Sequence, residues 1–255
     1  MAFVAFDIEI AKDIPDEERD WMALAPLGIA CVALMRHGES EPLLRFNPRQ
    51  HQDYYEPTTS AMNRQALDLV IDELVALADR GDTLVTWNGT SFDFQVLALE
   101  SGRRKDCARL ALASIDMMFW LVCQRGHPLA LDTALAGMGL GSKLHEVELA
   151  GGGKTVINGK EAPRLWRAGE FEAVLTYCGG DVRRTLELSL ECQRQQKLRW
   201  ISRRGAQSIV PLGTRWPTVR ECLELPVPDT SWMTNPLDRR TFVNWMSPFG
   251  VKSRG

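Results

Sequence analysis

The 255-residue sequence has no uninterrupted apolar segment long enough to cross a membrane. Its longest uncharged apolar-rich stretch, 21–35, contains Pro26 and Gly28 and is shorter than the roughly 20 residues that a membrane helix needs. The first ten residues have no basic leader and carry charge from Asp7 onward, so we expect no signal peptide. These absences predict a soluble, cytoplasmic protein without a membrane partner.

Closely spaced cysteine pairs are also missing. None of the six cysteines is separated from another by the short spacing of a zinc knuckle or a thioredoxin-type site. We therefore expect buried or free thiols in a reducing compartment. Internal repeats and low-complexity tracts are absent too, and the length predicts one large domain or one domain with an appendage. The cysteines are Cys31, Cys107, Cys123, Cys178, Cys192 and Cys222.

The chain has no excess of positive charge. It contains 30 lysine and arginine residues against 33 aspartate and glutamate residues, a formal net charge of −3. This balance argues against a protein that coats nucleic acid through a broad positive field. It does not exclude an enzyme that holds phosphate through metal ions, because such ions are often the largest local charges in a site.

Strand and helix patterns alternate along the chain in the manner of an α/β fold with a mixed sheet. Period-2 and apolar segments predict strands over 2–10, 28–36 and 42–46, forming a meander, and a fourth strand in TLVTWNG at 83–89. Apolar spacing predicts helices over 61–80 with Ser60 as cap, 92–100, much of 107–125, 131–138 and 170–196.

Two later segments have weaker patterns. The glycine-rich stretch 151–165 predicts a loop followed by a small hairpin that turns at Asn158-Gly159. The remainder, 197–255, predicts at most short elements, including a helix near Pro236. Its tryptophans indicate a segment that packs on the core, since disordered tails are poor in aromatic residues.

Asp7 and Glu9 are two residues apart on the first predicted strand. Both side chains therefore leave one face, separated by roughly 6 to 7 Å, while the intervening apolar residues face the core. Two carboxylates aimed together repel each other unless cations lie between them. An ordinary solvated edge strand is the alternative interpretation of such a pair taken alone.

Two more acidic positions follow at element ends or on helix faces. Asp93 opens the helix after the fourth strand, where a carboxylate also suits the helix dipole. Tyr177 and Asp181 are four residues apart and share one helix face. Gly179 and Gly180 between them each cost a helix about 1 kcal/mol relative to alanine, so we expect close backbone approach to the sheet or to a substrate.

The segments FDIE, NGTSFD and YCGGD, in this order, resemble the motifs of the tyrosine-bearing (DEDDy) branch of the DEDD 3′–5′ exonucleases. The resemblance is closest to the proofreading exonuclease domain of family-B DNA polymerases and their stand-alone bacterial or phage relatives. It covers residues 1–196 and leaves 197–255 as a C-terminal extension. It implies an RNase H-like fold, with a central mixed five-stranded sheet flanked by helices.

The resemblance also implies the site. Asp7, Glu9, Asp93 and Asp181 would bind two divalent ions, Mg²⁺ or Mn²⁺, and Tyr177 would orient the attacking water. No histidine stands five residues before Asp181, where the sister branch has its base. The expected substrate-binding residues are Ile8, Ile10, Asn88, Phe92, Asp116 and Lys154.

Two departures from the family pattern are visible. Ile10 stands where relatives commonly have a hydroxyl residue, and Gly179-Gly180 stand where they have a bulkier one. For Asp116, a helix-cap role is an equally good interpretation.

The resemblance predicts hydrolysis of single-stranded DNA from its 3′ end to mononucleotides, with replication or repair proteins as candidate partners. An exoribonuclease that trims RNA and a catalytically idle nucleic-acid-binding module stay open as alternatives. An RNase H-type endonuclease is less compatible, because such enzymes place their glutamate on a helix.

Overall fold

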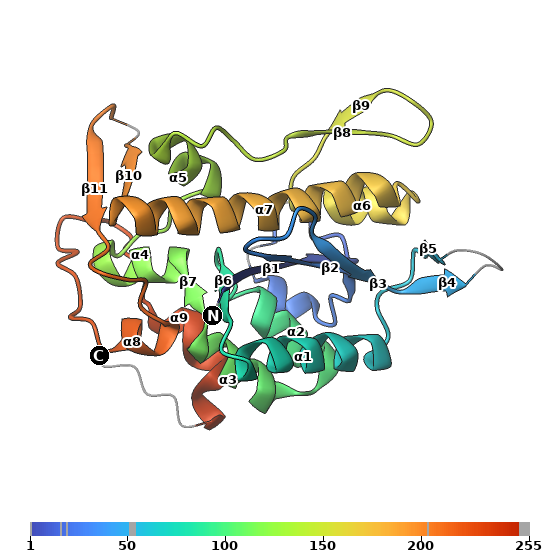
Figure 1. Cartoon of the computed structure of the whole chain (residues 1–255), viewed down its shortest axis with the longest axis horizontal. Helices are drawn as coiled ribbons and strands as arrows, with labels where there is room; N and C mark the ends of the chain where they lie inside the picture. Colours follow the sequence, from blue (N-terminus) through green and yellow to red (C-terminus); the bar gives the residue numbers. More distant parts are fainter. Residues whose placement is uncertain (1, 16, 19, 51–54, 203, 250–255) are drawn as a thin grey trace.

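The computed structural model describes residues 2–15, 17–18, 20–50, 55–202 and 204–249. A mixed five-stranded sheet forms its centre, with strand order β3-β2-β1-β6-β7 (Figure 1). The pairs β1–β2 and β2–β3 are antiparallel, whereas β1–β6 and β6–β7 are parallel. This confirms the predicted α/β fold and meander. The strands are β1 (Phe3–Ile10), β2 (Ile29–Arg36), β3 (Leu43–Phe46), β6 (Thr83–Thr86) and β7 (Ile115–Asp116).

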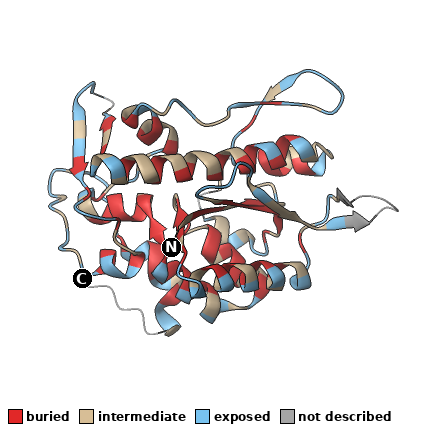
Figure 2. Cartoon of the chain, viewed as in Figure 1, coloured by how far each residue is buried: buried red, intermediate tan, exposed pale blue. Residues whose placement is uncertain are grey.

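Helices cover both faces of this sheet, with α7 above it and α1, α2 and α3 below it in Figure 1. The sheet and the inward faces of the helices form the buried layers in Figure 2. No helix among the described residues is both long and apolar enough to span a membrane. The bounds are α1 (Arg64–Asp79), α2 (Asp93–Ser101), α3 (Arg104–Ala113), α4 (Met117–Arg125), α5 (Leu131–Met138), α6 (Ala162–Arg167) and α7 (Phe171–Gln195).

Alternation along β1 sets the direction of its acidic side chains. Val4, Phe6 and Ile8 are buried in the core beneath the sheet, together with residues of α1 and α2. Ala5 lies in the second core, between the sheet and α7. Because side chains alternate along a strand, Asp7 and Glu9 share the face of Ala5 and point towards α7.

The start of α1 differs from the prediction. Asn63, not Ser60, is the cap, and its side chain accepts a hydrogen bond from the Ala66 amide at 2.9 Å. The preceding Met62 donates its backbone N–H to the Ile29 carbonyl at 2.7 Å, which keeps 61–62 extended beside β2. Because of this tertiary contact, α1 begins at Arg64 and not at residue 61, where the local pattern predicts its start.

The segment 107–125 is not one helical region. It contains the end of α3, the two-residue strand β7 and then α4. Ile115 and Asp116 pair with Val85 and Thr86 of β6. A strand this short has no periodicity of its own, so the apolar pattern of the two flanking helices concealed it.

The predicted hairpin after α5 is present but turns elsewhere. It pairs β8 (Glu146–Glu148) with β9 (Lys154–Val156) and turns through the glycines, where Gly152 and Gly153 have positive φ values of 87° and 88°. Asn158, by contrast, leads into α6, and its carbonyl accepts hydrogen bonds from the amides of Glu161 and Ala162.

Shorter elements complete the first 200 residues. A 3₁₀ turn, η1 (Trp21–Leu24), lies in the β1–β2 connection, and β4 (Pro48–Gln50) pairs with β5 (Tyr55–Pro57). All six cysteines are buried and free, as the sequence predicts.

The segment after α7 contacts the core through tryptophans. Trp216 donates to the Ser189 carbonyl of α7 at 2.9 Å and lies edge-on to Trp120 of α4. Trp245 donates to the Thr90 carbonyl at 2.8 Å. The predicted helix near Pro236 begins only at Arg240, and an unforeseen hairpin precedes it. The elements are β10 (Lys197–Ile201), β11 (Gln207–Pro211), α8 (Val219–Leu223), α9 (Arg240–Val243) and η2 (Asn244–Phe249). The domain boundary at residue 196 stays a prediction.

The two central glycines of α7 are not equivalent. A Cβ atom on Gly179 would lie 3.0 Å from Pro42 Cγ, whereas one on Gly180 would meet Leu144 Cβ at an ordinary 3.8 Å. We therefore expect Gly180→Ala to raise the free energy of unfolding by about 0.5 to 1 kcal/mol. We expect Gly179→Ala to gain less, because the tight contact with Pro42 offsets the helix propensity. Urea unfolding of both variants and the wild type measures the difference, and a larger gain for Gly179→Ala would contradict this assignment.

Candidate active site

β1 and α7 present acidic side chains to each other across the sheet face. Asp7 is half-buried, and Glu9 and Asp181 are 6% and 7% exposed. Tyr177, one helical turn before Asp181, is 2% exposed. The four-residue spacing on α7 and the two-residue spacing on β1 therefore turn all four side chains into one space.

Asp93 joins this group from a third element. It is the first residue of α2, only 3% exposed, and its Oδ1 accepts a hydrogen bond from the backbone amide of Ile8 at 2.9 Å. That bond fixes the Asp93 carboxylate beside β1 at Ile8, the residue between Asp7 and Glu9. The helix start that the sequence predicts thus lies beside the first motif.

Asp116 organises the turn that leads to Asp93. Its Oδ1 accepts from the Asn88 amide at 2.9 Å and its Oδ2 accepts from the Thr90 amide at 2.8 Å. The same carboxylate caps α4 by accepting from the Phe119 amide at 3.0 Å. Asp116 is 1% exposed. Its side chain is therefore committed to holding the turn, as the helix-cap interpretation had it, and does not face the cavity.

Lys143 is a site residue that the sequence did not reveal as such. Its ammonium lies 2.5 Å from Asp181 Oδ2, donates to the Tyr177 hydroxyl at 2.8 Å and sits 4.7 Å from the centre of that ring. The residue lies in the connection between α5 and β8, and its backbone amide donates to Asp132 Oδ1 at 2.7 Å. The only local signal was a lysine after the glycine pair of GLGSK at 139–143.

These side chains line one cavity of about 390 Å³. Asp7, Glu9, Asp93, Tyr177 and Asp181 are all among its lining residues. Of the expected substrate-binding residues, four line it as well, namely Ile8, Ile10, Asn88 and Phe92.

Lys154 is not brought to this cavity. It is exposed on β9, at the hairpin that turns through the glycines, and lies outside the lining residues. The remaining lining residues are Trp87, Met118, Leu129, Ala130, Leu131, Lys143, Gly159 and Thr185.

Burial and mutual repulsion raise the pKa values of the four carboxyl groups. The pKa of Asp7 is raised well above its ordinary value, first by burial and then by Asp93, Asp181 and Glu9. Burial likewise raises the pKa of Glu9, and it raises that of Asp93 to about 7. The pKa of Asp181 is raised by burial, although Lys143 opposes the shift.

The pKa values of Tyr177 and Lys143 are also raised, so both groups keep their protons at neutral pH. Burial raises the pKa of the Tyr177 phenol, and the nearby carboxylates add to this effect. For Lys143, burial lowers the pKa, but Asp181 and the acids of β1 outweigh it, so the net pKa is raised. Lys143 is therefore a cation and Tyr177 a neutral phenol at neutral pH.

The donor set fits a divalent cation. Asp181 Oδ1 is buried without a hydrogen-bond partner, and a buried carboxylate oxygen in that state is costly unless a cation or water binds it. Carboxylate oxygens of Asp7 and Glu9 lie within 4.8 Å of each other and of Cys178 Sγ. Hard oxygen donors favour Mg²⁺ or Mn²⁺. Cys178 is fully buried and its pKa is raised by its hydrogen bond with Cys31 and by burial, so it belongs to the core.

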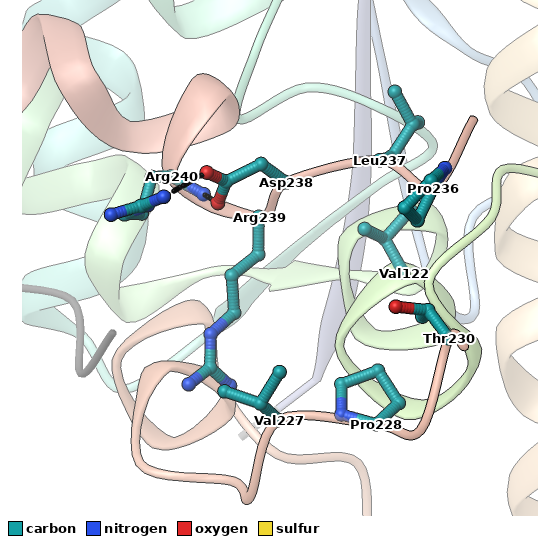
Figure 3. A pocket seen from close by; sticks show the side chains of 9 residues that line it. All are labelled: Val122, Val227, Pro228, Thr230, Pro236, Leu237, Asp238, Arg239 and Arg240. Carbon is teal, nitrogen blue, oxygen red and sulfur yellow. Dashed lines mark hydrogen bonds and ion pairs between the residues drawn. The ribbon is translucent and has the colours of Figure 1, made fainter. Parts of the chain in front are cut away.

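A cavity elsewhere offers no comparable chemistry. It has a volume of about 250 Å³ and lies between α4 and the segment 227–240 (Figure 3). Asp238 is the sole carboxylate among its lining residues, and it is ion-paired with Arg240. The acidic cavity between β1 and α7 is therefore the candidate active site.

Comparison with known families agrees with this assignment. A family model described as "Predicted 3'-5' exonuclease related to the exonuclease domain of PolB" matches residues 58–199, which is more than half of the chain. The matched region contains Asp93, Lys143, Tyr177 and Asp181, while Asp7 and Glu9 precede it. No curated protein matches the chain. The resemblance drawn from the three motifs is thereby confirmed, and the chain belongs to the family of predicted 3′–5′ exonucleases related to the exonuclease domain of PolB.

Proposed function

We propose that this protein is a metal-dependent exonuclease that hydrolyses single-stranded DNA from its 3′ end to mononucleotides. One observation carries the proposal: carboxylates from β1, α2 and α7 converge on one cavity with a neutral tyrosine and a cationic lysine. Such a concentration of buried acids is unfavourable for folding by itself. Its presence in a cavity indicates a functional site, not a structural one.

The four carboxylates, Asp7, Glu9, Asp93 and Asp181, would hold two divalent ions, Mg²⁺ or Mn²⁺. Bound there, the ions supply an activated water and stabilise the charge that develops on the phosphoryl oxygens. The chain's own part is to supply rigid ligands. Asp93 is held by the Ile8 amide and Asp181 by Lys143, while Asp181 Oδ1 has no hydrogen-bond partner and would be available to a cation.

Tyr177 and Lys143 would act together on the water side of the site. Lys143 donates to the phenol oxygen, and the phenol proton is hydrogen-bonded with Asp181, from which it would be redirected to a water molecule or a substrate oxygen when one binds. Because its pKa is raised, Tyr177 keeps this proton at neutral pH and serves to orient, not to accept a proton. The lysine charge also favours the approach of a phosphodiester to an otherwise acidic cavity.

The apolar lining suits the terminal nucleoside. Phe92 precedes Asp93 and is half-buried, and Ile10 follows Glu9 and is 4% exposed. Stacking of a base on an aromatic ring contributes roughly 1 to 3 kcal/mol and tolerates any sequence. Asn88, in the turn held by Asp116, would donate or accept hydrogen bonds at the sugar or base.

The test of this proposal uses matched DNA and RNA oligonucleotides of one sequence, labelled at the 5′ end, with Mg²⁺, Mn²⁺ or EDTA. We expect a descending ladder of shortened DNA with either metal and none with EDTA. Faster shortening of RNA would favour the exoribonuclease alternative. Binding of either polymer without shortening under any metal would favour the idle binding module.

The proposal makes stability depend on pH and on metal. The pKa of Asp93 is raised to about 7 from 3.8, so the folded chain holds its proton more tightly than the unfolded chain does. Folding of the metal-free protein therefore becomes less favourable as pH rises through this interval, and the loss is complete above about pH 7.

Both the wild type and Asp93→Asn are unfolded by urea in the presence of EDTA. Between pH 5 and pH 8, we expect the free energy of unfolding of the wild type to fall by about 2 to 3 kcal/mol relative to that of the variant. Excess Mg²⁺ should reverse the loss, because bound cations stabilise the ionised carboxylates. Urea titrations at fixed pH values measure this. The same pH profile for wild type and Asp93→Asn would contradict the assignment.

A further inference from the structure

The hairpin of β10 and β11 has one face in the core and one face in solvent. It lies beside α5 at one end of the molecule (Figure 1). Leu198, Trp200 and Val210 point into the core and are at most 5% exposed. Because side chains alternate along a strand, their neighbours form the opposite face, which we call the outer face. Its residues are Lys197, Arg199, Ile201, Gln207, Ile209 and Pro211.

Both edges of the hairpin are closed to a further strand. On the β10 side, α5 packs so tightly that a Cβ atom on Gly137 would overlap the Arg199 carbonyl oxygen, and Arg199 Nε donates to the Gly137 carbonyl at 2.8 Å. On the β11 side, Arg125 of α4 donates to the Ile209 carbonyl at 2.8 Å, and Pro211 has no N–H to offer. A partner would therefore contact the outer face through side chains, and not by extending the sheet.

The outer face exposes two large aliphatic side chains. Ile201 is 55% exposed and Ile209 is 44% exposed. Ile201 pairs with Gln207, so Ile209 is its diagonal neighbour on the same face, at a typical separation of roughly 7 to 8 Å. Adjacent exposed aliphatic residues are unusual on a protein surface and mark sites of interaction.

The outer face lies in a cationic segment of a chain that is acidic overall. Residues 197–220 contain six lysine and arginine residues and no aspartate or glutamate, whereas the whole chain has a formal net charge of −3. Arg204, in the turn of the hairpin, is exposed. Among the described residues, Lys197, Arg199 and Arg204 take part in no ion pair. The positive charge of this surface is therefore not matched by carboxylates of the chain itself.

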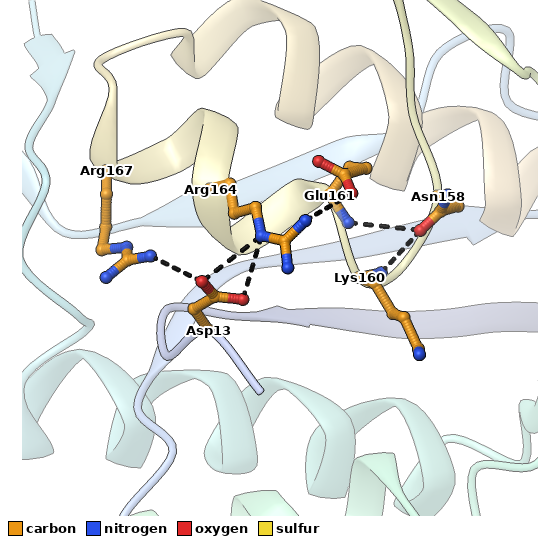
Figure 4. A network of polar contacts seen from close by, with 6 residues as sticks. All are labelled: Asp13, Asn158, Lys160, Glu161, Arg164 and Arg167. Atoms are coloured by element: carbon orange, nitrogen blue, oxygen red, sulfur yellow. Dashed lines mark hydrogen bonds and ion pairs between the residues drawn. The ribbon is translucent and has the colours of Figure 1, made fainter. Parts of the chain in front are cut away.

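Arginines elsewhere on the surface are paired within the chain. Asp13 in the β1–β2 connection accepts hydrogen bonds from Arg164 Nε at 3.2 Å and from Arg167 at 3.0 Å (Figure 4). Arg194, at the end of α7, is paired with Glu191 at 2.6 Å. The cations of the outer face differ from these because their charge is available to an anion from outside.

We propose that the outer face docks an acidic segment of a partner protein, in which aspartate or glutamate residues alternate with aliphatic ones. The aliphatic side chains of such a segment would cover Ile201 and Ile209, and its carboxylates would meet Lys197 and Arg199. This interaction goes beyond the proposed hydrolysis and uses none of the residues that line the acidic cavity.

Two other occupants fit the outer face less well. A nucleic-acid backbone would meet the cations but leave the isoleucines in water, and Trp200, the aromatic residue of the hairpin, points inward and offers no ring for a base to stack on. A second copy of the chain would bring the same positive charges face to face, which is unfavourable.

The experiment measures the fluorescence anisotropy of a labelled peptide in which aspartate and isoleucine alternate. Two matched peptides have serine in place of isoleucine or lysine in place of aspartate, and a short single-stranded DNA is tested in EDTA. We expect the full-length protein to bind the Asp/Ile peptide at least about 10-fold more tightly than either matched peptide. The affinity should fall as salt is added, because ions screen the contacts between charges.

Variants of the outer face separate its two contributions. Ile209→Ser should weaken binding of the Asp/Ile peptide about 10-fold, because an aliphatic contact is lost. Lys197→Glu should weaken it by a similar factor and reduce its dependence on salt. The controls are Leu69→Ser, at a residue of α1 that is 65% exposed, and Lys105→Glu, at an exposed residue of α3. Both helices lie on the far side of the sheet from α7, so both variants should bind as wild type does.

Each outcome decides for or against the proposal. Equal affinity for the three peptides, no binding by wild type at millimolar peptide, or unchanged binding by Ile209→Ser would overturn it. Tighter binding of the DNA, lost in Lys197→Glu and kept in Ile209→Ser, would assign the outer face to nucleic acid instead. Self-association of the protein that Ile209→Ser abolishes would assign it to a second copy. Thermal unfolding of each variant reports its fold, and none of these results bears on the exonuclease proposal.

Discussion

Asp7→Asn is expected to lower kcat/KM for metal-dependent shortening of single-stranded DNA by at least about 10³-fold. Asp7 leaves β1 at the centre of the acidic group, and its pKa is raised by burial and by all three other acids. An amide at this position offers one neutral oxygen where a cation needs a charged ligand. The loss should appear mainly in kcat, because the apolar surface that is proposed to bind the substrate is unchanged.

The same substitution should stabilise the metal-free protein. Asparagine keeps the volume of the side chain but removes a carboxylate that is desolvated and repelled by its neighbours, so the melting temperature in EDTA should rise above that of wild type. In Mg²⁺ the order should reverse, since only the wild type gains fully from metal binding.

Asp79→Asn is the matched control. Its side chain is 62% exposed at the end of α1, away from the cavity, and activity should be unchanged. A fully active Asp7→Asn variant, or one destabilised in EDTA, would contradict the proposed metal-ligand role of Asp7.

Lys143→Met is expected to lower kcat by about 10²-fold. Methionine preserves the length of the apolar side chain but removes the donor to Tyr177 and the countercharge to Asp181. The phenol then loses the contact that orients it. Without metal, Asp181 would also become a buried carboxylate without its ion-pair partner, and the free energy of unfolding should fall by about 3 kcal/mol at neutral pH.

Lys154→Met provides the matched control for this variant. Lys154 is the lysine that the sequence favoured as a substrate contact, yet it is exposed on β9 and outside the cavity. Its kcat and stability should stay close to those of wild type. Steady-state kinetics and urea unfolding of both variants measure the contrast, and a larger effect for Lys154→Met would exclude the assigned role of Lys143.

The positions of the four proposed acidic ligands were predictable from local rules, and the family resemblance joined them into one set. Alternation along a strand put Asp7 and Glu9 on one face, and helical spacing did the same for Tyr177 and Asp181. Asp93 followed from the helix start after the fourth strand. In each case the pattern extends over a few residues, and the sheet order then brings the elements together.

Lys143 could not be predicted in this way. Its contacts are with residues 34 and 38 positions later in the chain, and they depend on how the connection after α5 crosses α7. No periodicity encodes that crossing. The hairpin was misplaced because glycines 151–153 and the Asn158-Gly159 pair are both turn signals. In the structure β8 and β9 pair across the glycines, and the Asn158 carbonyl accepts the first amides of α6.

Asp116 illustrates a different limit. A carboxylate at an element end is compatible with a substrate contact and with a helix cap, and the sequence favours neither. Three backbone amides from two separate segments converge on it in the structure, and that convergence depends on β7, a strand too short to leave a pattern. Tertiary hydrogen bonds therefore decided its role.

The most direct test of the account is the order in which label leaves a single-stranded DNA whose 3′-terminal nucleotide alone is radioactive. With Mg²⁺ or Mn²⁺, the account predicts that all label appears first as a nucleoside 5′-monophosphate, before appreciable shortening of the chain, and that EDTA abolishes its release. Label released within oligonucleotides, or retained while the 5′ end is degraded, would contradict a 3′–5′ exonuclease built on these four carboxylates.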